Sequence, residues 1–210
     1  MSRADPDVID AVAKVFLIIE AFSAEQPELT IAAAAARTGL TRPTARRLLI
    51  TLVRLGYADT DGKTYRLTPQ VLRLGYAYLS STPLGERALP LMRRLADEVQ
   101  ESVSLAALDG AEIVYVARVP AARSMSITLT VGARLPAYPT SMGRVLLAGL
   151  PPEKLAEYLD STPLEPLTPR TLTDRAALEA ELARVAAQGW AVIDGEREIG
   201  VRSAAVPVRD

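Results

Sequence analysis

Residues 30–56 read TIAAAAARTGLTRPTARRLLITLVRLG, and this stretch decides the fold of the first part of the chain. Thr30 precedes an alanine-rich segment that ends at Gly39, which is the pattern of a short capped helix followed by a glycine turn. Thr41 predicts the start of a second helix, which Gly56 closes. The spacing therefore predicts two helices joined by a tight turn.

Two helices joined in this way form either a helix-turn-helix or an ordinary helical hairpin. A helix-turn-helix needs a small residue four positions before the turn glycine, and Ala35 stands there. The apolar residues suited to the helix crossing are Ala34, Leu40, Ala45 and Leu48. In an ordinary hairpin the arginines of the second helix would only form a solvated face. Because basic residues gather on the second helix and continue beyond it, the pattern favours the helix-turn-helix.

The sequence on either side extends this pair into a small domain. Apolar residues between positions 8 and 22 recur at three- and four-residue steps, which predicts an amphipathic helix before the pair. After the pair, residues 57–60 and 64–67 flank Asp61-Gly62, a two-residue hairpin signal. We therefore expect a β-ribbon, or wing, directly after the second helix of the pair.

The rest of the chain predicts a linker helix and a mixed α+β domain with helices packed on an antiparallel sheet. The linker helix is expected from Pro69 to about Leu79. Residues 124–131 alternate strictly between apolar and polar side chains, which predicts a half-buried strand. Further helices are expected at 86–101, 140–150, 152–159 and 174–188, and further strands at 103–108, 113–118, 190–194 and 201–208.

The formal net charge of −1 hides an uneven distribution of charge. Residues 1–36 carry a net charge of −4 and residues 74–210 carry −3, whereas residues 37–73 carry +6. This basic block covers the second helix of the pair and the ribbon. Such a local excess of positive charge is typical of a surface that binds a polyanion.

The chain has no histidine and no cysteine, which excludes several classes of chemistry. It cannot build a Ser-His-Asp triad, a thiolate nucleophile, or a zinc site with nitrogen or sulfur ligands. We expect no metal site and no cofactor. The first ten residues resemble neither a signal peptide nor a transit peptide, and no apolar run is long enough to span a bilayer. We therefore expect a cytoplasmic protein that does not associate with membranes.

The basic block suggests how the pair of helices would bind double-stranded DNA. A helix in the major groove presents its N-terminal residues to base edges, while flanking cations reach phosphates. The candidates on the helix are Thr41, Arg42, Thr44, Arg46 and Arg47, and those on the wing are Lys63 and Arg66. The division between base and phosphate contacts stays open for Arg42 and Arg46. One such unit makes too few contacts for selectivity, so we expect a dimer on a palindromic operator.

At this point the sequence resembles the IclR family of bacterial transcriptional regulators over nearly its whole length. The resemblance rests on the order and spacing of motifs in both halves. They are Leu29–Ile31, Arg37–Leu40, Arg46–Leu49, Leu55–Tyr57, Tyr65–Pro69, Gly132–Tyr138, Thr140–Ala148 and Gly200–Val208. The middle segment is similar to the branch that regulates β-ketoadipate-pathway genes, whose effectors are aromatic or pathway acids.

The resemblance implies a winged helix-turn-helix at 1–68, a dimerising linker helix at 69–83 and a GAF-like effector-binding domain at 84–210. It also implies a homodimer, or a dimer of dimers, that responds to a small organic acid. The positions that match effector contacts are Ser124, Ile127, Ser141, Met142, Asp194 (or its neighbour Ile193) and Ser203. Arg134 is a further candidate, as a carboxylate clamp, on its chemistry alone. Each of these residues could instead serve only packing, capping or surface pairing.

Family members usually continue beyond the segment that matches residues 207–210, so we expect the effector domain to be shortened here. Two other functions remain open. An enzyme would have to rely on carboxylates, and Asp194, Glu196 and Glu198 form the only compact acidic cluster in the later strands. An architectural DNA-binding protein would need no effector.

Overall fold

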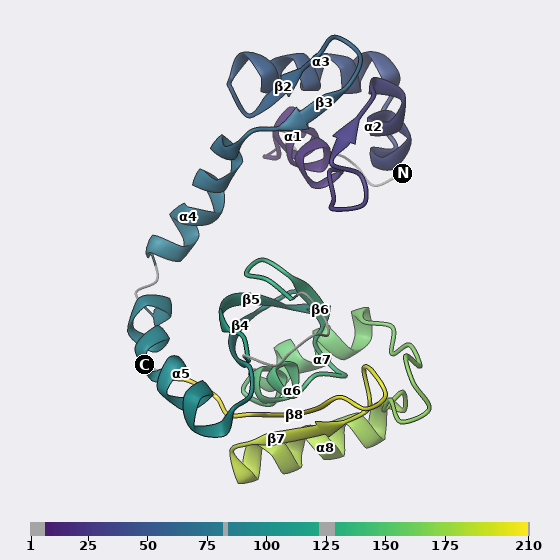
Figure 1. Cartoon of the computed structure of the whole chain (residues 1–210). Helices are drawn as coiled ribbons and strands as arrows, with labels where there is room; N and C mark the ends of the chain where they lie inside the picture. Colours follow the sequence, from purple (N-terminus) through teal and green to yellow (C-terminus); the bar gives the residue numbers. More distant parts are fainter. Residues whose placement is uncertain (1–6, 82–83, 122–128, 210) are drawn as a thin grey trace. The chain divides into compact units, whose positions relative to one another are not determined.

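The computed structural model describes residues 7–81, 84–121 and 129–209 (Figure 1). The chain divides into two compact units, Met1–Ser81 and Thr82–Asp210, each described by itself below. The expected three-part division at 68/69 and 83/84 stays a prediction. The first unit contains α1 (Asp10–Glu20), β1 (Glu28–Leu29), α2 (Ile31–Thr38), α3 (Arg42–Arg54), β2 (Ala58–Thr60), β3 (Tyr65–Leu67), the 3-10 helix η1 (Pro69–Val71) and α4 (Leu72–Ser81).

The two helices predicted around Gly39 are confirmed, and their ends are fixed as the sequence indicates. The hydroxyl of Thr30 accepts a hydrogen bond from the amide of Ala33 at 3.1 Å and so caps α2. Gly39 has a φ of 68°, a left-handed conformation that glycine adopts without a steric penalty. The hydroxyl of Thr41 accepts from the amide of Thr44 and caps α3.

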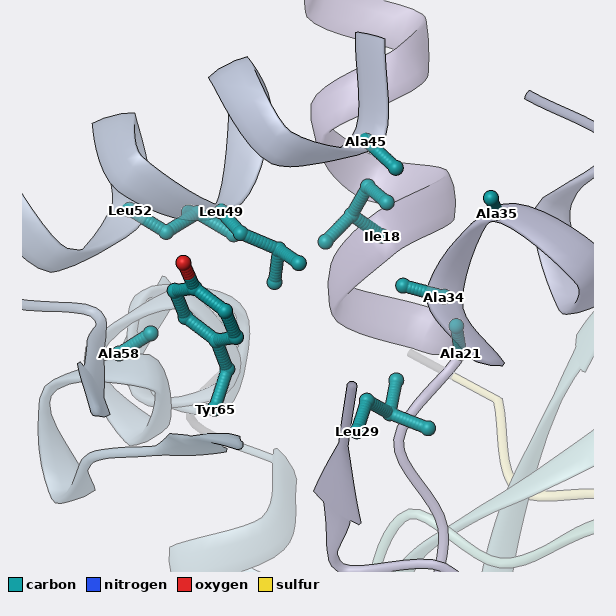
Figure 2. Close-up of a cluster of buried hydrophobic side chains, with 10 residues drawn as sticks. All are labelled: Ile18, Ala21, Leu29, Ala34, Ala35, Ala45, Leu49, Leu52, Ala58 and Tyr65. Carbon is teal, nitrogen blue, oxygen red and sulfur yellow. The ribbon is translucent and has the colours of Figure 1, made fainter. Parts of the chain in front are cut away.

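The core of the first unit lies between α1, α2, α3 and the wing (Figure 2). Ala34 of α2 and Ala45 of α3 are both fully buried, and Figure 2 shows them beside Ile18 of α1. Their small side chains let the helix axes approach closely. Leu49 and Tyr65 close the core on the side of the wing. The buried face of α3 therefore packs against the rest of this core.

The wing differs from its prediction in two respects. Thr60 pairs with Tyr65, so the hairpin loop has four residues rather than two. Asp61 stabilises the longer loop, because one of its carboxylate oxygens accepts hydrogen bonds from the amides of Lys63 and Thr64 at 2.8 and 2.7 Å. The sequence analysis also missed β1, whose Glu28 and Leu29 pair with β3 and give the sheet order β1-β3-β2.

The second unit is a mixed helix and sheet domain with antiparallel sheets, as expected. One sheet has the order β4-β5-β6 and the other consists of β7 and β8. Its elements are α5 (Leu84–Val99), β4 (Val103–Asp109), β5 (Glu112–Val119), β6 (Arg134–Pro136), α6 (Ser141–Ala148), α7 (Pro152–Ser161), α8 (Arg175–Gln188), β7 (Ala191–Asp194) and β8 (Arg202–Ala205).

Helix α6 lies at the centre of this unit, in contact with α8 and with both sheets. Leu147 of α6 is fully buried among residues from β5, α7 and α8. Val145 packs with Val185 of α8 and Ala191 of β7. Because α6 touches every layer, its position determines how the two sheets are spaced.

The strands of this unit differ from their prediction in three respects. The alternating stretch 124–131 lies largely outside the described residues, and its described end, residues 129–131, is not in a strand. Strand β6 was not predicted. β8 is shorter than the expected 201–208, because its pairing with β7 covers only Arg202 to Ala205.

The first turn of α6 leaves no room for a side chain at Gly143. A Cβ built there would lie 2.0 Å from the backbone oxygen of Ala137, because residues 137–140 fold over this turn. The same carbonyl accepts hydrogen bonds from the amide and hydroxyl of Thr140 at 3.1 and 3.0 Å, so it is not free to shift. At Gly149 a Cβ would meet only ordinary contacts of 3.5 Å or more.

We therefore expect Gly143→Ala to lower the free energy of unfolding by about 3 kcal/mol or more, as overpacking against fixed backbone does. Gly149→Ala, at the other end of the same helix, should change it by less than about 1 kcal/mol. Urea unfolding of both variants measures the difference. Equal free energies of unfolding for the two variants would show that residues 137–140 can move to accommodate the added methyl group without loss of stability.

Candidate nucleic-acid interface and effector site

The exposed face of α3 carries a group of arginines that make no ion pairs with the rest of the described chain. Arg42, Arg46 and Arg47 are exposed, and no hydrogen bond or salt bridge of their guanidinium groups is found among residues 7–81, 84–121 and 129–209. Together with Ile31 and Pro43 they line an open depression of about 410 Å³. An arginine that is not neutralised by its own chain keeps its full charge for a phosphate or a base edge.

The sequence analysis counted the charge of Arg54 but did not name it as a candidate for DNA contact. Arg54 follows Arg47 by seven residues, so both lie on the face of α3 opposite the buried Ala45 and Leu49. It is exposed, and no ion pair of Arg54 is found in the described part of the chain. The helical repeat was the signal that could have identified it.

The wing is less positive than its sequence indicates. Arg66 on β3 pairs directly across the ribbon with Asp59 on β2, and its Nη2 donates to the Asp59 carboxylate at 2.7 Å. This hydrogen bond is the main cause of a lowered pKa of Asp59. Lys63, in the exposed loop, has no such partner among the described residues. Lys63 is therefore the wing cation that is free to contact a phosphate without breaking an ion pair.

Apart from Arg134, the predicted effector residues that the structure describes lie at the start of α6 and near one end of the β7-β8 ribbon. Ser141 is buried at the start of α6, next to the capping residue Thr140, and Met142 packs on the core. Asp194 ends β7, and Ser203 is exposed on β8 opposite Ile193. Ser124 and Ile127 lie outside the described residues.

The geometry does not favour the carboxylate clamp expected of Arg134. Its guanidinium is exposed on β6 and donates to Glu112 at 2.7 Å, with Asp109 at 2.8 Å. These two carboxylates raise the pKa of Arg134 further. An organic acid would have to displace both of them. Arg134 therefore serves to join β6 to the β4-β5 hairpin.

A different arginine, Arg144 of α6, is buried inside this unit and was not named as a site residue. Its side chain is only 1% exposed, and Nη2 donates to Oε2 of Glu196 at 2.6 Å. Nε donates to the backbone oxygen of Tyr138 at 2.8 Å, and Nη1 lies 3.5 Å from Glu181. The sequence contained no local signal for this burial, because Glu196 stands 52 positions further along the chain.

The acidic cluster offered as a catalytic alternative is neutralised by the chain itself. Asp194 pairs with Arg170 at 3.1 Å and Glu196 pairs with Arg144, while Glu198 pairs with the neighbouring Arg197 at 3.4 Å. A general acid or base needs a free approach to its substrate, and each of these three carboxylates is instead engaged by an arginine.

A helix-turn-helix with an antiparallel wing and unneutralised arginines along its second helix defines a DNA-binding regulator. Comparison with known proteins agrees. The model described as the IclR helix-turn-helix domain matches residues 11–62, and that described as the bacterial transcriptional regulator IclR C-terminal matches residues 76–210. The chain belongs to the IclR family of transcriptional regulators. Its homologues are regulators rather than enzymes.

Several relatives carry names that fit the expected branch of the family. The chain is 48% identical over 207 residues to the Pca regulon regulatory protein of Pseudomonas putida, covering 98% of this chain and 71% of that protein. It is 37% identical to the p-hydroxybenzoate hydroxylase transcriptional activator of Acinetobacter baylyi, covering 96% and 76%. The resemblance to regulators of aromatic acid catabolism through the β-ketoadipate pathway is therefore confirmed.

A solved structure is also similar over almost the whole chain. It is an IclR homolog from Microbacterium hydrocarbonoxydans in complex with 4-hydroxybenzoate, with a TM-score of 0.82 and 30% identity over 95% of this chain and 83% of that one.

Within the described residues, no helix has both the length and the apolar composition needed to cross a membrane.

The pairing of Arg66 with Asp59 generates a prediction about DNA binding. Asp59→Ala should release Arg66 for a phosphate contact, so the slope of log affinity against log salt should steepen by about 0.9, the value for one phosphate. Glu20→Ala removes an equal charge from the end of α1 and should leave the slope unchanged. Fluorescence anisotropy with duplex DNA over a salt series measures both. An unchanged slope for Asp59→Ala would show that Arg66 does not reach DNA.

Proposed function

We propose that the chain binds a palindromic operator as a homodimer, or as a dimer of dimers, and that a small organic acid modulates this binding. The observation that carries the proposal is the group of three arginines on α3 for which no carboxylate partner is found among the described residues. Three adjacent cations repel one another, so a protein gains by keeping them exposed only if they meet an anion. The DNA duplex supplies phosphates and guanine edges in the required geometry.

The position of each residue on α3 suggests its role at the groove. Thr41, Arg42 and Thr44 belong to the first turn, which a recognition helix presents to base edges. Arg46 and Arg47 follow one turn later, and either can reach guanine or a phosphate. On the flanks, Arg54, Lys63 and Arg66 are suited to phosphate contacts, although Arg66 must first leave Asp59.

The surface of α4 supports a role in dimerisation. Leu72 and Tyr76 are 73% and 70% exposed, and the exposed Leu74, Tyr78 and Leu79 lie on the same short helix. Large apolar side chains gathered on one helix are costly in water, and a second copy of the helix would cover them. Two DNA-binding units held in this way match the two half-sites of a palindrome.

For the effector we propose an aromatic or dicarboxylic acid, bound where α6 begins and where β7 and β8 meet. Support comes from the 4-hydroxybenzoate in the Microbacterium homolog and from the chemistry of the region. The first turn of a helix presents backbone N–H groups that favour a carboxylate. Ser141, Met142, Asp194 and Ser203 are the described candidates for contact. Because its DNA target lies in the cytoplasm of a bacterium, we place the protein there.

The DNA-binding assignment predicts a specific loss in the double variant Arg46→Ala/Arg47→Ala. Binding to a duplex selected by the wild-type chain from a random library should weaken by about a hundredfold or more, since each good arginine contact contributes about 1–3 kcal/mol. Thermal unfolding should not change, because both side chains are exposed. The matched control Arg175→Ala/Arg184→Ala removes two arginines from α8 and should bind normally. Retained affinity in the first variant would refute the assignment.

Calorimetry tests the effector class. We expect 4-hydroxybenzoate, protocatechuate or β-ketoadipate to bind with measurable heat, and 4-hydroxybenzyl alcohol, which lacks the carboxylate, to bind at least about tenfold more weakly. The bound acid should also change the affinity for the selected duplex. Heat from none of the acids would favour a DNA-binding protein without an effector of this class.

A further inference from the structure

Arg144 is the one buried charged residue among the described residues of the second unit. An arginine that is 1% exposed loses nearly all of its hydration, a cost that only close partners can offset. Arg144 offsets this cost through Glu196 at 2.6 Å, the Tyr138 carbonyl at 2.8 Å and Glu181 at 3.5 Å. These partners lie before α6, after β7 and on α8, so one side chain ties together three separate parts of the chain.

Glu196 is in turn held by the segment that contains Thr168, Thr171 and Leu172. The Oε2 atom that receives Arg144 also accepts a hydrogen bond from the amide of Leu172 at 3.1 Å. The hydroxyl of Thr171 donates to the backbone oxygen of Glu196 at 2.6 Å, and that of Thr168 donates to the backbone oxygen of Gly195 at 2.7 Å. The side chain of Glu196 and the backbone of the turn after β7 are therefore both held in place. Glu196 has little freedom to move toward another partner.

The pair connects the two elements that carry the proposed effector residues. Arg144 stands directly after Ser141, Met142 and Gly143 in the first turns of α6. Glu196 lies two residues after Asp194, in the connection that leads from β7 to β8. A change in the distance between Arg144 and Glu196 would therefore change the distance between the two halves of the effector site.

We propose that Arg144 and Glu196 are positioning residues for the effector, and that their ion pair sets the spacing between the start of α6 and the β7-β8 connection. This inference rests on the effector site proposed above. The pair does not touch the organic acid. It preorganises the groups that do, so that binding does not have to order them.

Glu181 provides a matched comparison, because it also faces Arg144 but belongs to α8. It lies farther from Arg144, is held by Arg184 at 2.7 Å, and carries no proposed effector residue on its helix. Glu196→Gln and Glu181→Gln each remove one negative charge beside the same arginine. If the pair contributed only buried charge, the two variants would behave alike.

Hydrogen exchange on the full chain without ligand tests the positioning directly. In Glu196→Gln, amides in the first turn of α6, such as Gly143 and Arg144, should exchange roughly tenfold faster, together with those of residues 195–201. In Glu181→Gln neither segment should change. Faster exchange spread evenly over the whole unit, or in neither segment, would overturn the proposal. Should Glu196→Gln not fold, Thr171→Val takes its place with the same expected pattern, because it removes the hydroxyl that donates to the Glu196 carbonyl at 2.6 Å and accepts from the amide of Thr168 at 2.8 Å.

Binding of 4-hydroxybenzoate gives a second readout that a purely structural role would not produce. Glu196→Gln should weaken it roughly tenfold and leave the acid-free affinity for the selected duplex unchanged, with Glu196→Asp intermediate and Glu181→Gln normal. Equal weakening in Glu196→Gln and Glu181→Gln would overturn the proposal. If the wild-type chain binds none of this acid, the proposed effector class fails, and the exchange experiment alone decides whether the pair positions α6.

Discussion

The close crossing of α2 and α3 is the constraint on which the DNA-binding unit depends. Ala34 and Ala45 face this part of the core beside Ile18 and have no exposed surface, so a larger side chain at either position would push the helices apart. Because Ala45 and Leu49 turn one face of α3 into the core, the opposite face must lie in solvent. The packing of alanines thus determines where the arginines of the recognition helix point.

The arginines of α3 differ from the ion-paired arginines of the fold in having no carboxylate partner within the described part of the chain. Arg66, Arg134 and Arg144 each pair with a carboxylate at 2.6–2.8 Å, whereas no such pair is found for Arg46 or Arg47 in the described part of the chain. Exposed ion pairs contribute little to stability, so their main effect is to remove charge from the surface. Charge that is left unbalanced on one face of one helix then marks the site for an external anion.

Local features of the structure could be predicted from the sequence, and long-range ones could not. Thr30 and Gly39 fix the ends of α2 through bonds within a few residues, which a single sequence reveals. The two-residue strand β1 exists only because β3, far along the chain, pairs with it. The burial of Arg144 could not be predicted for the same reason, because its partner Glu196 stands 52 positions away along the chain. The candidate DNA contacts were found from spacing and charge, but the pairing that neutralises Arg66 depended on the register of the wing.

The buried ion pair also limits how an effector could act on DNA binding. Separating Arg144 from Glu196 would leave a charge unpaired in the interior, at a cost of about 3–5 kcal/mol, which exceeds the typical coupling of about 1–3 kcal/mol between two ligand sites. A ligand therefore has too little coupling energy to act by loosening this region. A ligand shifts an equilibrium between two states only as far as its affinities for them differ. The two states between which an effector shifts the protein must therefore both keep the Arg144–Glu196 pair intact. The proposed effector unit would then respond by moving as a preformed body, and α4, whose exposed apolar side chains are proposed above to meet a second copy, is the element that we expect to register that movement.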